Sequence, residues 1–319
     1  MQLGGPDSLE AVQPFLYNLF CDPDIIDLPG AFLFRKTLAR MISTRRAPKV
    51  QELYRKIGGR SPILPQTLTQ AESLKKELEQ RGHPMDVMVA MRYWQPFTDE
   101  AVRGLLAKNI DEVVLLPLYP HYSRTTTGSG VHEWTRTLKR LNASHLRWQL
   151  IESYYDHPLY IHAIVERIRE ALDDVPQTQR KAVHSVFSAH GTPIQLVKAG
   201  DPYSGQIRRT YELVLERGNF GLPHHLCFQS KVGPQRWLEP SLTQTIEDLG
   251  KAGVSHVVVI PISFVSDHIE TLSEINLEAR AEAHAAGISS FTMTKPLLTS
   301  EPFIWCLAEL VIHRIAGSR

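Results

Sequence analysis

Cysteine is scarce in this chain. Its 319 residues include three cysteines, Cys21, Cys227 and Cys306, which stand far apart and form no Cys-x-x-Cys pair. This spacing excludes a zinc ribbon, a thioredoxin-like motif and a four-cysteine iron–sulfur site built by one chain. So few cysteines suit a reducing compartment. We therefore expect a cytoplasmic protein without an iron–sulfur cluster.

Long apolar runs, a strong net charge and phosphate-binding loops are also missing. No apolar run approaches the ~20 residues of a membrane span. A formal net charge of +1 gives no overall attraction to nucleic acid. Neither Gly-x-Gly-x-x-Gly nor the P-loop pattern occurs, which argues against a nucleotide-dependent transferase. An apolar content of 43% and a charged content of 22% are typical of a globular protein of one large or two ordinary domains.

One segment departs from the even distribution of charge. Residues 28–51 contain no acidic residue but several basic ones, and bulky apolar side chains precede or overlap them. Such a segment could rest on an anionic membrane surface or attract an anionic substrate. It fits equally well a helix that packs on the core and turns a basic side to solvent. The basic residues are Arg35, Lys36, Arg40, Arg45, Arg46 and Lys49.

Two segments follow one plan and indicate an internal repeat. Residues 111–123 and 255–267 each contain a run of Leu or β-branched residues, then a proline, then polar residues. A helical pattern precedes each segment, and an apolar strand pattern precedes each helix. This alternation predicts parallel sheets covered by helices on both faces. The helical patterns are 99–109 and 241–252, and the strand patterns are 86–94 and 225–231.

The repeat predicts an α/β fold of two Rossmann-like lobes with the active-site cleft between them. We place the lobes at residues 1–155 and 156–299, and a C-terminal helix at 300–319 that packs back on the first lobe. Leu3-Gly4-Gly5-Pro6 has the pattern of a strand-to-helix loop, although only two residues precede it. We therefore expect the first strand to be absent or to lie upstream. The other predicted helices are 69–81, 156–172, 203–217, 267–286 and 300–315.

The strongest chemical signal is a row of carboxylates after a buried strand. An apolar strand is predicted at 256–265, and Asp267, Glu270, Glu274 and Glu278 follow it at spacings that line one helix face. Open α/β sheets bind ligands at the carboxyl ends of their strands, where carboxylates can hold a hard cation or relay protons. The first two acids also fit a capping box, with the other two on an ordinary solvated face.

A second polar element ends another apolar strand, in the motif Ser188-Ala189-His190-Gly191-Thr192-Pro193. A neutral imidazole accepts a proton near pH 7, so His190 is a candidate general base. The alternative is a hydrogen-bonded histidine at a strand end. Gly191 would let a flat ligand approach the backbone closely.

Eight motifs, quoted at the end of this paragraph, occur along the whole chain in a fixed order. In that order they resemble the ferrochelatases, the enzymes that insert ferrous iron into a porphyrin in haem synthesis. The resemblance implies two Rossmann-type lobes and a porphyrin cleft lined by His190 and Glu270. The opening motif, with Asp7 and Ser8, resembles the protoporphyrin-using branch. Animal relatives carry an iron–sulfur cluster near a cysteine-rich C-terminus, whereas this chain has only Cys306 there. The motifs are Leu3-Gly4-Gly5-Pro6, residues 57–63, Met91-Arg92-Tyr93, residues 117–123 with 126–128, residues 188–191, Gly200-Asp201-Pro202-Tyr203, residues 229–234 with Trp237, and residues 266–274.

The resemblance gives particular residues expected roles in metallation. Insertion of a cation must remove two N–H protons from the porphyrin, so we expect His190 to act as the base. Glu270 would pass iron, protons or both, and the two residues together would be the metal ligands. Glu274, Glu278, Asp267 and His268 would extend or orient this path. The porphyrin-binding candidates are Tyr54, Arg60, Ser61, Arg92, Tyr93, Tyr119, Tyr122, Ser123 and Trp237.

The expected partners are a porphyrin and ferrous iron, both as substrates. We expect no permanent cofactor, no nucleic acid, and a monomer or homodimer that transiently contacts a membrane surface or the preceding haem-pathway enzyme. Alternatives are a coproporphyrin III ferrochelatase, a chelatase for cobalt or sirohydrochlorin, and a non-enzymatic porphyrin or haem carrier. A carrier would not need both a basic histidine and an acidic row.

Overall fold

The computed structural model describes residues 1–25, 31–231 and 235–317, which form two compact units. Unit 1 comprises Met1–Ser153 and Leu307–Arg319, and unit 2 comprises Tyr154–Cys306. The boundary near the C-terminus lies inside helix α11 (Glu301–Ala316), so this helix belongs to unit 1 only from Leu307 onward. Residues 232–234 of one sequence motif and residues 26–30 of the apolar and basic segment lie outside the described residues.

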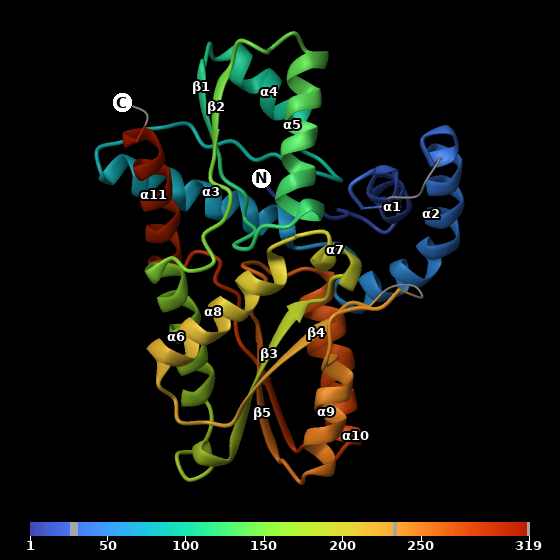
Figure 1. The fold of residues 1–319 in the computed structure, drawn as a ribbon, viewed down its shortest axis with the longest axis vertical. Helices are drawn as coiled ribbons and strands as arrows, with labels where there is room; N and C mark the ends of the chain where they lie inside the picture. Colours follow the sequence, from blue (N-terminus) through green and yellow to red (C-terminus); the bar gives the residue numbers. More distant parts are fainter. Residues whose placement is uncertain (26–30, 232–234, 318–319) are drawn as a thin grey trace. The chain divides into compact units, whose positions relative to one another are not determined.

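Unit 2 is built on a four-stranded parallel sheet with the strand order β4-β3-β5-β6 (Figure 1). Its central strands are β3 (Val183–His190) and β5 (His256–Pro261), which are rich in β-branched residues and buried on both faces. The edge strands are β4 (His224–Gln229) and β6 (Ser290–Met293). The predicted strand 256–265 therefore ends four residues early, because Phe264 N–H already donates to Pro261 O in a turn.

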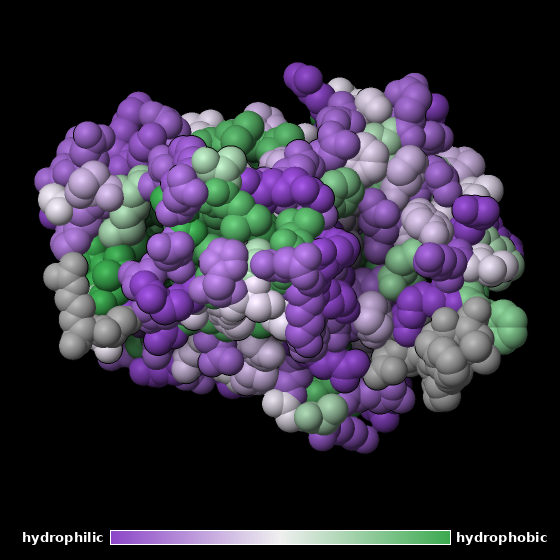
Figure 2. Space-filling view, turned by 90° about the horizontal axis from the view of Figure 1, so that it is seen from above, coloured by the Kyte–Doolittle hydropathy of each residue, from purple (hydrophilic) through white to green (hydrophobic). Residues whose placement is uncertain are grey.

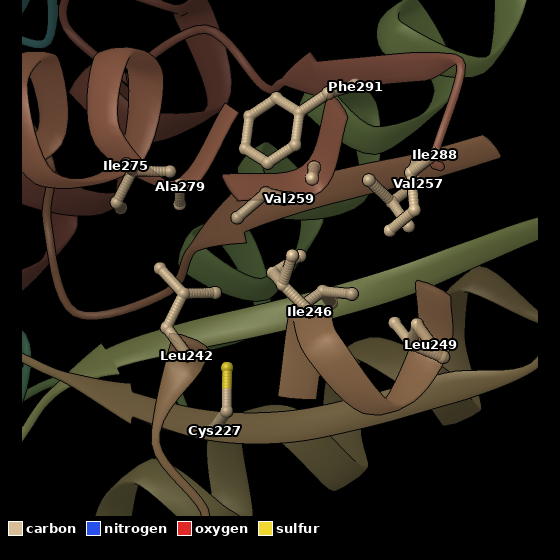
Figure 3. Close-up of a cluster of buried hydrophobic side chains, with 12 residues drawn as sticks. Cys227, Leu242, Ile246, Leu249, Val257, Val259, Ile275, Ala279, Ile288 and Phe291 are labelled. Carbon is tan, nitrogen blue, oxygen red and sulfur yellow. The ribbon is translucent and has the colours of Figure 1, made fainter. Parts of the chain in front are cut away.

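Helices cover both faces of this sheet, as the sequence predicts (Figure 1). Val257 and Val259 pack with α9, η3 and α10 in one buried cluster (Figure 3). Val258 and Ile260 point to the opposite face, because side chains alternate along a strand, and this face carries α6 and α8. The α/β class with parallel sheets flanked by helices is confirmed. The helix bounds are α6 Pro158–Asp173, η2 Arg180–Ala182, α7 Ile194–Lys198, α8 Tyr203–Gly218, α9 Leu242–Lys251 and α10 Arg280–Ala285.

The predicted helix 267–286 is present over residues 270–285, but its first part is a π-helix rather than an α-helix. The chain forms a π-helix, η3 (Glu270–Ala279), that continues as α10. Here the Ser273 hydroxyl donates to Glu278 five residues ahead, at 3.2 Å. The sequence pattern did not reveal this wider turn, because apolar residues spaced three and four apart are also what an α-helix shows. π-Turns inside helices occur frequently at functional sites.

Unit 1 contains a two-stranded parallel sheet of β1 (Glu112–Leu115) and β2 (Arg147–Leu150). Helices α4 (Thr98–Ala107) and α5 (Ser129–Arg140) pack on it through a cluster that includes Trp134. Helix α3 begins at Ile63, six residues before the predicted start, and ends at Gln80. The remaining elements are α1 Val12–Cys21, α2 Ala31–Lys56 and the π-turn η1 Arg124–Gly128.

The predicted strand 86–94 does not form as a regular strand. Met91 makes isolated parallel bridges with Gln2 and Phe97 instead. Gln2 N–H donates to Ala90 O at 3.0 Å, and Leu118 N–H donates to Met1 O at 2.9 Å. The first residues of the chain thus pair on both sides like the last residues of a strand.

None of the helices in the described part of the chain combines the length and the apolar character that crossing a membrane requires.

Candidate functional site

His190 and Glu270 form a direct hydrogen-bonded pair in unit 2. His190 is the last residue of β3 and Glu270 is the first residue of η3, and Nδ1 lies 2.9 Å from Oε2. The backbone of His190 is fixed on both sides, because its N–H donates to Ser263 Oγ at 3.0 Å and Tyr203 OH donates to its carbonyl at 3.0 Å. The two residues that were predicted to line the site are therefore held together at the carboxyl end of a central strand.

The pair stabilises opposite charges on its two members. Burial opposes protonation of His190, but the neighbouring Glu270 carboxylate outweighs it, so the pKa of His190 lies above 6.5. Burial also opposes ionisation of Glu270, and the two imidazoles of His190 and His268 outweigh it, so the pKa of Glu270 lies well below 4.5. The Glu270 carboxylate consequently stays ionised at neutral pH, and the His190 imidazole gains or loses its proton beside that negative charge.

The Nε2 atom of His190 is the part of the pair available to a substrate. The side chain is 37% exposed, and within the described residues Nε2 has no hydrogen-bond partner. When Nδ1–H donates to Glu270, Nε2 carries the lone pair. This is the arrangement in which a carboxylate orients an imidazole that accepts a proton from a substrate.

His268 lies on the other side of the same carboxylate. Its Nε2 is 3.5 Å from Glu270 Oε2, and its ring lies 4.5 Å from that of Phe264. The residue is 7% exposed, and its Nδ1 is buried without a partner in the described residues. Phe264 also meets His190 edge to face, with ring centroids 6.4 Å apart. The aromatic ring thus holds two imidazoles around one carboxylate.

The other carboxylates of the acidic row accept hydrogen bonds from hydroxyl groups. Ser230 Oγ donates to Glu274 Oε2 at 2.6 Å. Burial, together with repulsion from the Glu270 carboxylate, raises the pKa of Glu274 to about 7. Glu274 therefore gains and loses a proton near neutral pH, whereas the neighbouring Glu270 stays ionised.

Asp267 and Glu270 do not form the capping box that the sequence allowed. The residue before η3 is Ile269, which makes no side-chain capping bond. Asp267 accepts a hydrogen bond from Thr271 Oγ1 at 3.0 Å, and Glu270 turns to His190. The capping interpretation is wrong, because His190 offers the Glu270 carboxylate a charged partner that a backbone N–H cannot match.

Gly191 is required by the packing of the protein itself. A Cβ atom at this position would lie 2.7 Å from Gln229 O and 3.3 Å from the Trp237 ring. Trp237, a predicted porphyrin-binding residue, is thereby placed beside the end of β3, where it also forms an antiparallel bridge with Pro193. Gln229 continues this layer, since it accepts from Ser188 Oγ at 2.7 Å.

In unit 1 the predicted residues Arg92 and Tyr93 belong to a buried network that the sequence did not reveal. Arg92 lies 2.8 Å from the Asp22 carboxylate and donates to Ser129 Oγ at 2.8 Å. Tyr93 OH donates to Asp22 at 2.6 Å. Burial opposes ionisation of Asp22, and the Arg92 charge with these hydrogen bonds lowers its pKa below 3.8. Asp22 and Ser129 carry no local motif, so only their contacts identify them.

The other predicted porphyrin residues of unit 1 differ in exposure. Tyr54, Ser61 and Ser123 are buried, at 2%, 5% and 1% exposed, so they support the fold around them. The Ser61 N–H donates to Pro6 O, and Ser123 Oγ accepts from Thr125 N–H at the start of η1. Arg60 is exposed, and Tyr119 and Tyr122 are partly exposed.

The described residues contain no group of three His, Cys, Asp or Glu side chains arranged to hold a metal ion. Cys21, Cys227 and Cys306 are free thiols, and the last two are buried. A metal ion at His190 and Glu270 would therefore need further ligands from water or from a bound molecule.

Comparison with known proteins relates the whole chain to one family. A family model described as Ferrochelatase matches residues 1–315. A ferrochelatase of Aquifex aeolicus (strain VF5) is 46% identical over 99% of this chain and 98% of the relative. A ferrochelatase of Citrifermentans bemidjiense is 47% identical over 98% of this chain and 96% of the relative.

Solved structures of low identity share the fold. SirB from Bacillus subtilis, solved with Fe3+, has a TM-score of 0.57 at 12% identity and covers 78% of this chain and 90% of its own. CbiX, described as the terminal enzyme of sirohaem biosynthesis in denitrifying bacteria, has a TM-score of 0.53 at 14% identity and covers 79% of this chain and 93% of its own.

Proposed function

Because this chain belongs to the ferrochelatase family of enzymes, which insert a metal ion into a porphyrin, we propose that it inserts Fe2+ into protoporphyrin IX. The reaction joins Fe2+ to the four ring nitrogens and releases two protons. The observation that carries the proposal is the His190–Glu270 pair, 2.9 Å apart, with an unbonded Nε2. Haem formation of this kind makes the enzyme a lyase.

His190 is the proposed acceptor of the pyrrole protons. Its Nε2 accepts a proton from a ring N–H while Nδ1–H stays bonded to Glu270. The imidazolium that forms is stabilised by the ionised carboxylate, which lowers the free energy of the step that leaves charge on the protein. Iron would then meet the ring nitrogens as the protons leave.

Glu270 and Glu274 form the proposed exit for protons. Glu270 is ionised and orients His190, whereas Glu274 titrates with a pKa of about 7 one turn further along η3. A group whose pKa equals the ambient pH releases and takes up protons with little free-energy cost in either direction. The same carboxylates and the imidazole are ligand types that Fe2+ accepts.

The preference for protoporphyrin rests on the charge of unit 1. Coproporphyrin carries more propionate groups than protoporphyrin and needs more cations to bind them. Arg92, the predicted propionate ligand, is bound by Asp22 at 2.8 Å and faces Glu133 at 3.7 Å. Because its charge is offset inside unit 1, the less charged porphyrin is the better match.

Anaerobic incubation with Fe2+ tests both the reaction and the substrate. We expect porphyrin fluorescence to disappear faster with protoporphyrin IX than with coproporphyrin III. Faster loss with coproporphyrin III would overturn the substrate assignment. Tight binding of both porphyrins without metallation would identify a carrier and overturn the reaction.

Glu274→Gln should make the protein more stable and the enzyme slower. A carboxyl group whose pKa is raised on folding binds its proton more tightly in the folded state, so its cost to stability appears as pH rises through 4.5 and is complete above about 7. We expect a gain of about 1 kcal/mol at pH 8, after allowance for solvent, and about tenfold slower metallation. Thermal melts at pH 5 and pH 8 with steady-state rates would measure both.

Equal stability of Glu274→Gln and the parent at pH 8 would contradict the burial argument. Unchanged turnover would remove Glu274 from the proton path. Glu247→Gln is the matched control, because Glu247 is a 51% exposed acid on α9 of the same unit.

We also propose that α2 contacts an anionic membrane surface. Phe34 and Met41 are 69% and 62% exposed and seven residues apart, so they share a helix face, with exposed Lys36 and Arg40 beside them. Flotation with anionic vesicles at low salt should carry the protein upward. A Phe34→Ser/Met41→Ser variant should stay behind, whereas Leu68→Ser, at a 51% exposed leucine of α3, should float. Equal flotation of all three proteins would exclude α2.

A further inference from the structure

Two histidines of unit 2 lie in direct contact on neighbouring strands. His184 is the second residue of β3 and His225 is the second residue of β4, and these strands pair side by side in the sheet (Figure 1). His184 Nδ1 lies 3.0 Å from His225 Nε2, and the planes of the two rings differ by only 6°. Hydrophilic side chains cover much of the face shown in Figure 2, so a single exposed histidine would carry no argument. Two imidazole nitrogens held this close together need an explanation.

The register of the sheet holds the two rings on one face. Val186 is the partner of His225 across the two strands, and His184 lies two residues before Val186. Because side chains alternate along a strand, all three point to the face where Val186 belongs to the buried cluster with α9 and α10. Both histidines are partly exposed, so a small ion in solution can reach them. The backbone therefore fixes the pair while leaving it accessible.

His224, the neighbour of His225, belongs to the opposite face. It is paired with Ser185 across the strands, and its Nδ1 lies 2.6 Å from the hydroxyl oxygen of Tyr211 on α8. Among the described residues, no third His, Cys, Asp or Glu side chain joins the pair in an arrangement that could hold a metal ion. An ion bound by His184 and His225 would therefore complete its coordination with water.

The two nitrogens are close to the spacing that one metal ion requires. Bonds from a metal ion to imidazole nitrogen are about 2.0–2.1 Å long, so two such bonds at right or tetrahedral angles separate the nitrogens by about 2.9–3.4 Å. In the hydrogen-bonded pair, one ring donates its N–H to the lone pair of the other. A proton shift to the outer nitrogen of the donor ring frees both lone pairs. Rotation of each ring about its bond to Cβ, which is a soft torsion, turns both lone pairs to one ion.

Both imidazoles are held in the neutral form that metal ligands need. Burial lowers the pKa of His184 below 6.5, and burial together with the neighbouring His184 and His224 lowers the pKa of His225. At neutral pH neither ring has to give up a positive charge before it binds an ion. His190 differs, because Glu270 raises its pKa above 6.5. The two ends of β3 therefore carry histidines with opposite tendencies, one to bind protons and the other to remain neutral.

We propose that His184 and His225 form a second metal site, which binds one divalent ion of the Zn2+, Ni2+ and Cu2+ class through both imidazoles. Imidazole nitrogens suit these ions, and the usual order of affinity places Fe2+ below Ni2+ and Cu2+. Mg2+ and Ca2+ prefer oxygen ligands and should not bind. His190 is six residues further along β3, about 20 Å away in an extended strand, so this site is separate from the His190–Glu270 pair. The bound ion links β3 to the edge strand β4.

Titration of the full chain with Zn2+, followed by NMR of its 15N-labelled histidine rings, tests the site without any substitution. We expect the ring-nitrogen signals of His184 and His225 to shift together as Zn2+ is added, and to stay in place with Mg2+. The signals of His190 report separately on any ion at the His190–Glu270 pair. Unchanged signals of His184 and His225 at millimolar Zn2+ would show that the two rings are only hydrogen-bonded to each other, and would overturn the proposal.

Two variants distinguish a defined site from loose binding by surface histidines. Even indirect support of a ligand is worth about tenfold to 100-fold in metal affinity, so His225→Gln, which removes a direct ligand, should weaken Zn2+ binding at the His184 ring at least about tenfold. Zn2+ should also raise the Tm of this variant less than that of the parent. His224→Gln is the matched control, because His224 is adjacent on β4 but points to the other face, and it should bind Zn2+ like the parent. Equal weakening by both variants would assign the ion to scattered histidines and contradict the proposed site.

Discussion

His190→Ala should reduce metal insertion by about 100-fold to 10,000-fold while porphyrin binding persists. The substitution removes the Nε2 that accepts the pyrrole protons and leaves Glu270 without the partner that lies 2.9 Å from it. The porphyrin nitrogens would then lose their protons only to water. Stopped-flow loss of porphyrin fluorescence under anaerobic conditions measures the rate, and fluorescence titration without iron measures binding.

His184→Ala is the matched control for this experiment. His184 lies on the same strand, six residues earlier, and its Nδ1 is 3.0 Å from His225 Nε2, in a pair without Glu270. It should keep nearly full activity. Near-normal turnover of His190→Ala would exclude this histidine as the base and leave Glu270 as the residue that takes the proton.

Glu270→Gln should slow metallation by about tenfold or more and move the pH profile to lower pH. The base is active only when neutral, so the acid limb of the kcat/KM profile follows the pKa of His190 in the free enzyme. That pKa is raised above 6.5 because Glu270 outweighs the effect of burial. An uncharged glutamine leaves burial unopposed, and the pKa of His190 falls.

The direction of the pH shift distinguishes this role from a purely structural one. A variant that merely loosened the site would lose rate equally at every pH. An acid limb that stayed in place or moved to higher pH would contradict electrostatic control of His190 by Glu270. Glu247→Gln again serves as the control, because its carboxylate lies on the exposed side of α9 near Lys251.

The repeat of apolar run, proline and polar exit was sufficient to predict the fold class. It works because a central parallel strand is buried on both faces and reads as an uninterrupted apolar run, as in Val257 to Ile260. The apolar run at 86–94 has the same kind of side chains but does not form a regular strand. Its backbone pairs only near its end, where Met91 bridges Gln2 and Phe97 and Gln2 N–H donates to Ala90 O.

Within the site, the sequence indicated the residues but not their bonds. His190 and Glu270 end or follow buried strands, and such positions are visible from hydrophobic pattern alone. The two residues are 80 positions apart in the chain, and their direct contact depends on β3 and β5 being neighbours in the sheet. Local spacing does not predict such a pairing. Asp22 and Ser129 are site residues that the sequence did not indicate. Both are bound by Arg92, which is distant from them in the chain, so no local motif identifies them.

The wide turn of η3 makes the length of this stretch matter as much as its composition. Glu270 begins the π-helix, and Ile275 and Ala279 on the same segment are buried in the core of unit 2 (Figure 3). Ala283 in α10 belongs to the same buried cluster. Removing one residue would tighten the coil and rotate everything after it by about 100° relative to Glu270. The acid could then face His190, or the alanines could face the sheet, but not both. The position of Glu270 and the burial of the alanines both depend on the number of residues in η3. This segment should therefore tolerate substitutions more readily than insertions or deletions.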